Sequence, residues 1–183
     1  MSNKTNNKRR IPPSVVSKRS EGVAFGNFNR KSALRIIDAN LNRCREGLRV
    51  VEDSLRFVLN DGSFYKKVRG IRHDVDKILR DNYGKLIKER DSSDDSGRQM
   101  PELLKKELSG VIVANFKRVQ ESLRVLEEYS KTFFPEASAD FKKQRYAAYS
   151  AEKLVYLKYR KFFIAKAYEG GAVNAIAGKK SLQ

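Results

Sequence analysis

The chain has one cysteine, one histidine and no long apolar run, and each shortage removes a class of protein. Cys44 alone cannot form an internal disulfide, and one cysteine with one histidine cannot build a Cys/His zinc site. No apolar stretch approaches the length that crosses a bilayer, and the N-terminal MSNKTNNKRR lacks the apolar core of a secretory signal. We therefore expect a cytoplasmic protein with no membrane partner.

Sequence motifs for nucleotide and acyl chemistry are also missing. Neither a nucleophile elbow nor a Rossmann glycine pattern occurs. The C-terminal GGAVNAIAGKKS resembles a phosphate-binding loop, but six residues separate Gly171 from Gly178 where that motif has four, and no strand precedes it. No segment alternates in the period-two manner of a strand, which favours an all-α fold.

Positive charge is concentrated at the two ends of the chain. The net charge is +17, and residues 1–35 carry nine Lys/Arg against one acid. Residues 141–183 carry ten Lys/Arg against two acids, whereas residues 36–140 are almost neutral, with 20 bases and 19 acids. Basic ends of this kind attract polyanions, such as nucleic acid or phosphorylated ligands.

Apolar residues recur at steps of three and four from about Ser32, which predicts long amphipathic helices. The first stripe consists of Ile37, Leu41, Cys44, Leu48, Val51, Leu55 and Val58. We expect this helix to stop at Asn60-Asp61-Gly62, with Ser63 capping a second helix that runs to about Leu86. A third helix should end at Pro135, and a fourth should run from Asp140 to about Tyr168. The predicted organisation is a basic irregular extension (1–32), a helical bundle (33–168) and a basic tail (169–183).

The same helical motif occurs twice. ANLNRCREGLRVVED (39–53) aligns with ANFKRVQESLRVLEE (114–128) at an offset of 75 positions, and eight of the fifteen residues are identical. The apolar stripes share this offset. We infer a four-helix-type bundle built from two duplicated helical hairpins, related by a pseudo-two-fold axis.

These repeats, together with IRHD (71–74) and RDSSDDSG (90–97), resemble the ThiD2 family over about residues 33–134. This helical domain stands alone or lies at the N-terminus of thiamine phosphate synthase in some bacteria. Ser92 and Ser96 stand where the family loop more often has Thr and Val. The resemblance implies a transferase of thiamine biosynthesis, similar to hydroxymethylpyrimidine phosphate kinase. Such an enzyme would take a phosphorylated pyrimidine as substrate, with ATP and Mg²⁺; without kinase activity no cofactor is implied.

Phosphoryl transfer requires cations on the phosphates, oxygen ligands for Mg²⁺ and a positioned acid or base. The catalytic candidates are His73 and Asp94, and the metal candidates are Asp91 and Asp95. Residues shared by the two repeats are the candidates for binding the phosphorylated substrate: Asn40, Arg43, Glu46, Arg49, Arg118, Glu121 and Arg124.

Each candidate also has a structural interpretation that stays open. Arg and Glu three residues apart usually form solvated pairs within one helix. A lone histidine on a helix is usually structural, and an Asp-Ser loop is most often a surface turn. Cys44 lies on the apolar stripe and is expected to be a small core residue.

A second hypothesis is a protein that binds RNA or the ribosome through its basic ends. The residues that would contact RNA are Lys8, Arg9, Arg10, Lys18, Arg19, Lys142, Lys143 and Arg145. Tyrosines in the fourth helix could stack on bases, although we favour a place for them in the bundle core: Tyr146, Tyr149, Tyr156 and Tyr159. The sequence also leaves room for a homo-oligomer.

Overall fold

A computed structural model describes residues 29–93 and 107–163, and the regular structure in these two ranges is entirely helical. Four long helices are α1 (Arg30–Asp53), α2 (Gly62–Ile78), α4 (Leu108–Phe133) and α5 (Pro135–Lys158). Three short elements are the π-helical turn η1 (Ser54–Val58), the 3₁₀ turn η2 (Arg80–Asn82) and α3 (Tyr83–Lys88). The described ranges contain no strand, so the all-α prediction is confirmed.

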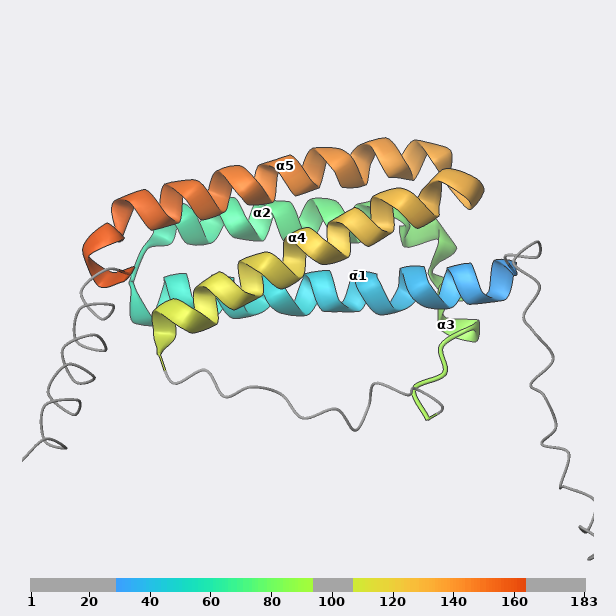
Figure 1. The fold of residues 1–183 in the computed structure, drawn as a ribbon, viewed down its shortest axis with the longest axis horizontal. Helices are drawn as coiled ribbons and strands as arrows, with labels where there is room; N and C mark the ends of the chain where they lie inside the picture. The colour runs from blue at the N-terminus through green and yellow to red at the C-terminus, as the bar shows by residue number, and fades with distance from the viewer. Residues whose placement is uncertain (1–28, 94–106, 164–183) are drawn as a thin grey trace, which may run out of the picture.

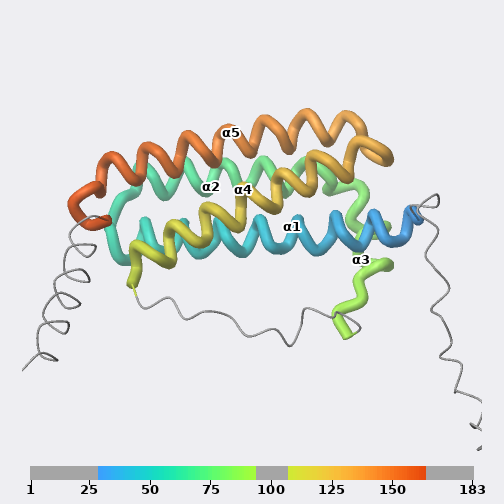
Figure 2. Tube along the Cα trace, viewed as in Figure 1, coloured from blue at the N-terminus to red at the C-terminus, as the bar shows by residue number. Residues whose placement is uncertain are grey.

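The four long helices form a bundle of two hairpins (Figure 1). Helix α1 packs against α2 and α4, and α5 packs against the same two helices. The tube view shows that neighbouring helices run antiparallel and that α4 crosses α1 obliquely (Figure 2). In this arrangement α1 is equivalent to α4, and α2 is equivalent to α5, as expected for two hairpins related by a pseudo-two-fold axis. The predicted bundle of two duplicated hairpins is therefore confirmed.

The bundle core is built from the predicted stripes. From α1, Ile37, Leu48 and Val51 are fully buried, and α4 contributes Phe116 and Leu123. Side chains at three- and four-residue spacing meet on one face of each helix, so they are removed from water together. Val58 is the exception to the predicted α1 stripe, because it lies in the π-helical turn and is 61% exposed.

Cys44 lies within this core with no exposed surface. Burial, with a smaller contribution from the charge of Asp76, raises the pKa of the thiol to about 12. A thiol with so high a pKa is not a nucleophile at neutral pH. The prediction that Cys44 is a core residue is confirmed.

The turn between α1 and α2 is organised by Asp61 rather than by Ser63. The Asp61 carboxylate accepts hydrogen bonds from the backbone N–H groups of Ser63 and Phe64, both at 3.1 Å, and so caps α2. The predicted cap at Ser63 is wrong, because the helix begins at Gly62 and Ser63 therefore lies inside its first turn. Lys158 and Tyr159 at the end of α5 donate to the other carboxylate oxygen at 2.6 and 2.7 Å.

The pKa of Asp61 is lower than that of an ordinary aspartate. Burial alone would raise it, but the hydrogen bonds from Lys158, Tyr159 and Phe64, with the Lys158 charge, lower it to about 2. An unfolded aspartate has a pKa of about 3.9, so the unfolded chain takes up this proton first on acidification. The contribution of the carboxylate to stability is therefore complete above about pH 5 and is lost as the pH falls toward 2.

Asp61→Asn is expected to remove the pH-dependent contribution of this carboxylate to stability, while the Asn side chain still caps α2. The variant should be about 1 kcal/mol less stable than the wild type at pH 6, a value reduced for the exposure of Lys158. This difference should shrink as the pH approaches 2, in urea unfolding followed by circular dichroism. Asp140→Asn, at an exposed α5 position, is the control. A wild-type-to-variant difference that is constant with pH would contradict the role of the charge.

Three further helix boundaries differ from the prediction, and one of them is the end of α5, which lies at Lys158 rather than near Tyr168. Helix α5 begins at Pro135 and not at Asp140, because proline is well suited to the first turn of a helix. The second predicted helix breaks at Leu79, whose φ of −121° and ψ of 27° leave the helical region. The chain then turns through η2 into α3, which packs on α1 and buries Leu86. This bend places α3 beside α1 and forms the end of a groove.

Candidate functional site

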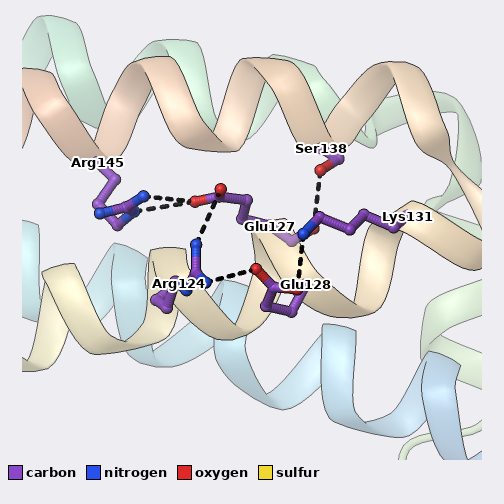
Figure 3. Close-up of polar contacts among 6 residues, drawn as sticks. All are labelled: Arg124, Glu127, Glu128, Lys131, Ser138 and Arg145. Carbon is purple, nitrogen blue, oxygen red and sulfur yellow. Dashed lines mark hydrogen bonds and ion pairs between the residues drawn. The ribbon is translucent and has the colours of Figure 1, made fainter.

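Each half of the bundle contains a buried glutamate that is held by an arginine of the next helix. Glu52 on α1 has no exposed surface and accepts hydrogen bonds from Arg72 on α2 at 2.6 and 3.3 Å. In the second half, Arg145 on α5 donates to Glu127 on α4 at 3.0 and 2.8 Å (Figure 3). A paired, hydrogen-bonded carboxylate tolerates burial, whereas an unpaired one does not. These two cross-helix pairs fix the geometry of each hairpin.

Two arginines of the repeat, Arg49 and Arg124, pair within their own helices. Arg49 lies 3.6 Å from Glu52 and 3.2 Å from Asp53. Arg124 contacts Glu127 at 3.1 Å and Glu128 at 2.8 Å, as Figure 3 shows. These are the intrahelical pairs of the structural interpretation. Arg49 thus belongs to the network of α1 and α2, and Arg124 belongs to the separate network of α4 and α5.

The repeated asparagines also have matching roles. Asn40 donates its side-chain amide to the carbonyl of Ile36 at 2.9 Å, and Asn115 does the same to Val111 at 2.9 Å. Both side chains are therefore used within their own helix. The Asn, Arg and Glu residues that the two repeats share are therefore explained largely by contacts that hold the helices together.

A groove lies between α1, α2 and α3. Its inner hollow has a volume of about 300 Å³, and a wider opening of about 710 Å³ continues along α1. The two share Asn42, Arg45 and Tyr83 in their linings. Arg72 and Arg90 line the opening as well. We call this feature the arginine groove.

Carboxylates hold the arginines of this groove in place. Arg90 forms a two-pronged contact with the buried Asp38, at 2.7 and 2.8 Å. Arg45 lies 2.7 Å from Asp76, which is also 3.7 Å from Arg72. A guanidinium fixed along one edge keeps its other N–H donors in a defined orientation, which suits the recognition of phosphate.

The two best-held guanidinium groups stay charged under all ordinary conditions. The hydrogen bond that Arg90 donates to Asp38 raises the pKa of Arg90, and the hydrogen bond that Arg72 donates to Glu52 raises that of Arg72. The side chain of Arg90 remains 38% exposed and that of Arg45 45% exposed. Both are therefore in reach of a ligand in the opening. The groove offers fixed positive charge next to Tyr83, whose side chain is exposed.

Only part of the predicted site lies at this groove. Glu46 and Arg49 line the opening, and Asn40 is buried in the helix-internal contact described above. Arg43 is exposed on α1 outside the lining, and His73 is exposed on α2. Arg118, Glu121 and Arg124 lie on α4, in the other hairpin. The structure does not bring the predicted set together.

The predicted loop residues fall partly outside the described ranges. Asp94 and Asp95 lie outside them. Asp91 is exposed, and its backbone carbonyl accepts a hydrogen bond from Arg35 at 2.8 Å. The repeat motif did not point to Arg45, Arg72 or Arg90 as site residues. Two of these arginines lie in motifs that the sequence does show, because Arg72 is part of IRHD and Arg90 is the first residue of RDSSDDSG.

Residues 29–93 and 107–163 contain no cluster of three carboxylate, histidine or cysteine side chains that could hold a metal ion. Three acids line the arginine groove; Asp38 and Asp76 are each engaged by arginine, and Glu46 lies at the wider opening. The described part of the chain therefore does not fit a resident Mg²⁺.

Three tyrosines predicted to lie in the core are on the surface. Tyr146, Tyr149 and Tyr156 are 55%, 39% and 42% exposed. The core positions next to these tyrosines are taken by Ala148 and Ala151 instead.

Of the RNA-binding candidates, Lys142 and Lys143 are exposed, whereas Arg145 is engaged by Glu127. The remaining candidates lie outside the described residues: Lys8, Arg9, Arg10, Lys18 and Arg19. RNA binding stays a prediction.

Fold and groove together define a class of protein, a duplicated helical-hairpin bundle with an arginine-lined groove in its first hairpin. The ThiD2 family model matches residues 35–154, and the chain belongs to the ThiD2 family. No solved structure matches the chain. Among the described residues, no helix is both long enough and apolar enough to cross a membrane.

Several curated relatives carry the name thiamine-phosphate synthase. The one from Rhodopirellula baltica is 40% identical over 136 residues, which cover 72% of this chain and 36% of the relative. Those from Nostoc punctiforme and Synechocystis sp. are 39% and 40% identical, each over 64% of this chain and 34% of the relative. The chain thus spans about a third of the length of these relatives.

Proposed function

We propose that the protein acts in thiamine biosynthesis and phosphorylates hydroxymethylpyrimidine phosphate, which it binds in the arginine groove. Family membership and the names of the relatives support the pathway. The groove supports the class of ligand, because it offers fixed guanidinium groups beside an exposed aromatic ring.

The observation that carries this proposal is the convergence of three arginines from separate elements. Arg45 comes from α1, Arg72 from α2 and Arg90 from the residues after α3, and all three line one opening. Each is anchored by a carboxylate, so little side-chain entropy is lost when a phosphate binds. Tyr83 and Asn42 supply a ring face and an amide to a pyrimidine.

In the proposed reaction, an oxygen of the substrate phosphate attacks the γ-phosphorus of ATP. The bond from that phosphorus to the bridging oxygen breaks, and ADP leaves with the electron pair. Any Mg²⁺ enters with the phosphates of the nucleotide. The groove arginines stabilise the negative charge that develops on the transferring group.

Arg45→Gln is expected to lower kcat/KM for this phosphorylation about 100-fold, because a fixed cation is removed from the transferring phosphate. The measurement follows ADP formation and the diphosphate product by chromatography. The fold should be retained, because Asp76 keeps Arg72 as a neighbour. Arg43→Gln, at an exposed α1 position outside the groove, is the matched control and should change kcat/KM less than about twofold.

Absence of turnover by the wild-type protein would contradict the proposal. A cellular test complements the assay: a strain that lacks the gene should need thiamine for growth, and the Arg45→Gln gene should restore growth poorly. Equal loss of activity in the Arg43→Gln and Arg45→Gln variants would argue against the groove as the site.

A further inference from the structure

A second groove lies between α4 and α5, in the other hairpin. It has a volume of about 240 Å³, and aromatic and aliphatic side chains dominate its lining. Val113 and Phe116 come from α4, Tyr149 and Tyr156 from α5, and Phe163 from the residues after α5. None of its lining residues belongs to the arginine groove. We call it the aromatic groove.

The duplication places the two grooves at equivalent positions. Helix α1 maps onto α4 at an offset of 75, so Asp38 corresponds to Val113 and Leu41 to Phe116. Helix α2 maps onto α5 at an offset of 73, which the matching pairs Glu52–Arg72 and Glu127–Arg145 establish.

Equivalent backbone positions carry different chemistry in the two halves. With the offset of 73, Asp76 of the arginine groove corresponds to Tyr149 of the aromatic groove. Carboxylates that hold arginines in the first half are thus replaced by an aliphatic and an aromatic side chain in the second. The change of lining indicates a different ligand.

The rim of the aromatic groove is positively charged on one side. Glu152 is neutralised, because it accepts a hydrogen bond from Gln120 at 2.6 Å and lies 3.3 Å from Lys117. Lys153, which corresponds to Arg80 of the first half, lines the same groove and is exposed. Within residues 29–93 and 107–163 no acid pairs with Lys153, so its charge is available to a ligand.

We propose that the aromatic groove binds a planar aromatic compound that carries an anionic substituent. The ring lies against Tyr149, Tyr156 and Phe163, and the anion lies at Lys153. The rings of Tyr156 and Phe163 are 5.5 Å apart, centroid to centroid, at an interplanar angle of 36°. Offset and tilted aromatic contacts of this kind favour a flat ligand over a branched aliphatic one. Complementary charge at the rim selects an acidic substituent.

Three probes separate the two parts of the ligand in a titration followed by NMR of the full chain. Adenosine monophosphate has a ring and an anion, adenosine lacks the anion, and ribose 5-phosphate lacks the ring. We expect adenosine monophosphate to shift the signals of Val113, Tyr156 and Phe163, with adenosine binding more weakly and ribose 5-phosphate not shifting them. Hydroxymethylpyrimidine phosphate is the fourth probe. Shifts of the same signals with this probe would show that the groove also accepts an anionic compound with a single aromatic ring.

Two variants test the assigned contacts. Lys153→Gln should weaken adenosine monophosphate about tenfold and leave adenosine unchanged, and Tyr156→Ala should weaken both. Both positions are exposed, so the fold should be kept, and the Arg45→Gln variant of the other groove should bind normally. Absence of shifts at Val113 and Tyr156, equal shifts with ribose 5-phosphate, or no effect of Lys153→Gln would each overturn the proposal. These outcomes do not depend on turnover at the arginine groove.

Discussion

Arg72→Met is expected to lower the free energy of unfolding by about 3 kcal/mol, because it leaves the fully buried Glu52 carboxylate without its main partner. Removal of one member of a buried ion pair typically costs about 3–5 kcal/mol. The lower end applies here, because Arg49 still lies 3.6 Å from Glu52. Urea unfolding followed by circular dichroism measures the change.

A double variant separates the uncompensated charge from the loss of packing. Glu52→Leu with Arg72→Met should recover most of the lost stability, since an apolar pair of similar volume often replaces a buried ion pair without loss. Lys131→Met is the exposed control, because its ion pair with Glu128 lies at the surface, where such a pair contributes little to stability. If Arg72→Met destabilised the protein no more than Lys131→Met, Glu52 would not depend on this contact.

Gly47→Val is expected to cost about 2–3 kcal/mol, because α4 lies directly against this glycine of α1. A Cβ at Gly47 would lie 2.9 Å from Cγ2 of Val119 and 3.2 Å from the backbone oxygen of Asn115. The second repeat also has a small residue at the equivalent position, the buried Ser122. Thermal and urea unfolding should both report the loss.

Alanine substitutions at two glycines give a matched comparison. Gly47→Ala should still destabilise by about 1 kcal/mol, since the clash exceeds the gain in helix propensity. Gly70→Ala, in the middle of α2 with open space around its Cβ, should instead stabilise by about 0.5–1 kcal/mol. If both substitutions stabilised the protein equally, the close approach of α1 and α4 would not constrain this position.

The helices and their pairing could be predicted from the sequence, because both depend on local periodicity. Ile37, Leu48 and Val51 are buried as the first stripe predicts, and their counterparts on α4 follow from the offset of 75. Asn40 and Asn115 are identical residues with the same hydrogen bond. A repeated pattern at helical spacing specifies which faces meet, and this information is present in each helix alone.

The arginine groove could not be predicted in the same way, because its contacts join residues far apart in the chain. Arg90 reaches Asp38 across 52 positions, and Arg72 reaches Glu52 across 20. The turn at Leu79 that brings Arg90 to α1 has no proline or glycine beside it to mark it in the sequence. Spacing within one helix therefore favoured Arg43 and Arg49, although the groove is formed by three elements.

The tyrosines of α5 show a second limit of helical periodicity. Tyr149 and Tyr156 are large and semi-polar, and they were expected inside the bundle, yet both are exposed. Beside these tyrosines the inner face of α5 carries Ala148, Ala151 and Val155, whereas the large Phe141 is buried nearer the start of the helix. Size rather than hydrophobicity decides these positions, and the size of the available space is set by the partner helices.

Site-resolved NMR during titration with hydroxymethylpyrimidine phosphate tests the central claim most directly. We expect saturable shifts of the backbone signals of Asn42, Arg45 and Tyr83, weakened about tenfold or more in Arg45→Gln and unchanged in Arg43→Gln. Shifts confined to the exposed Lys142 and Lys143, or no saturable shift at the arginine groove, would contradict the assignment of this groove as the binding site.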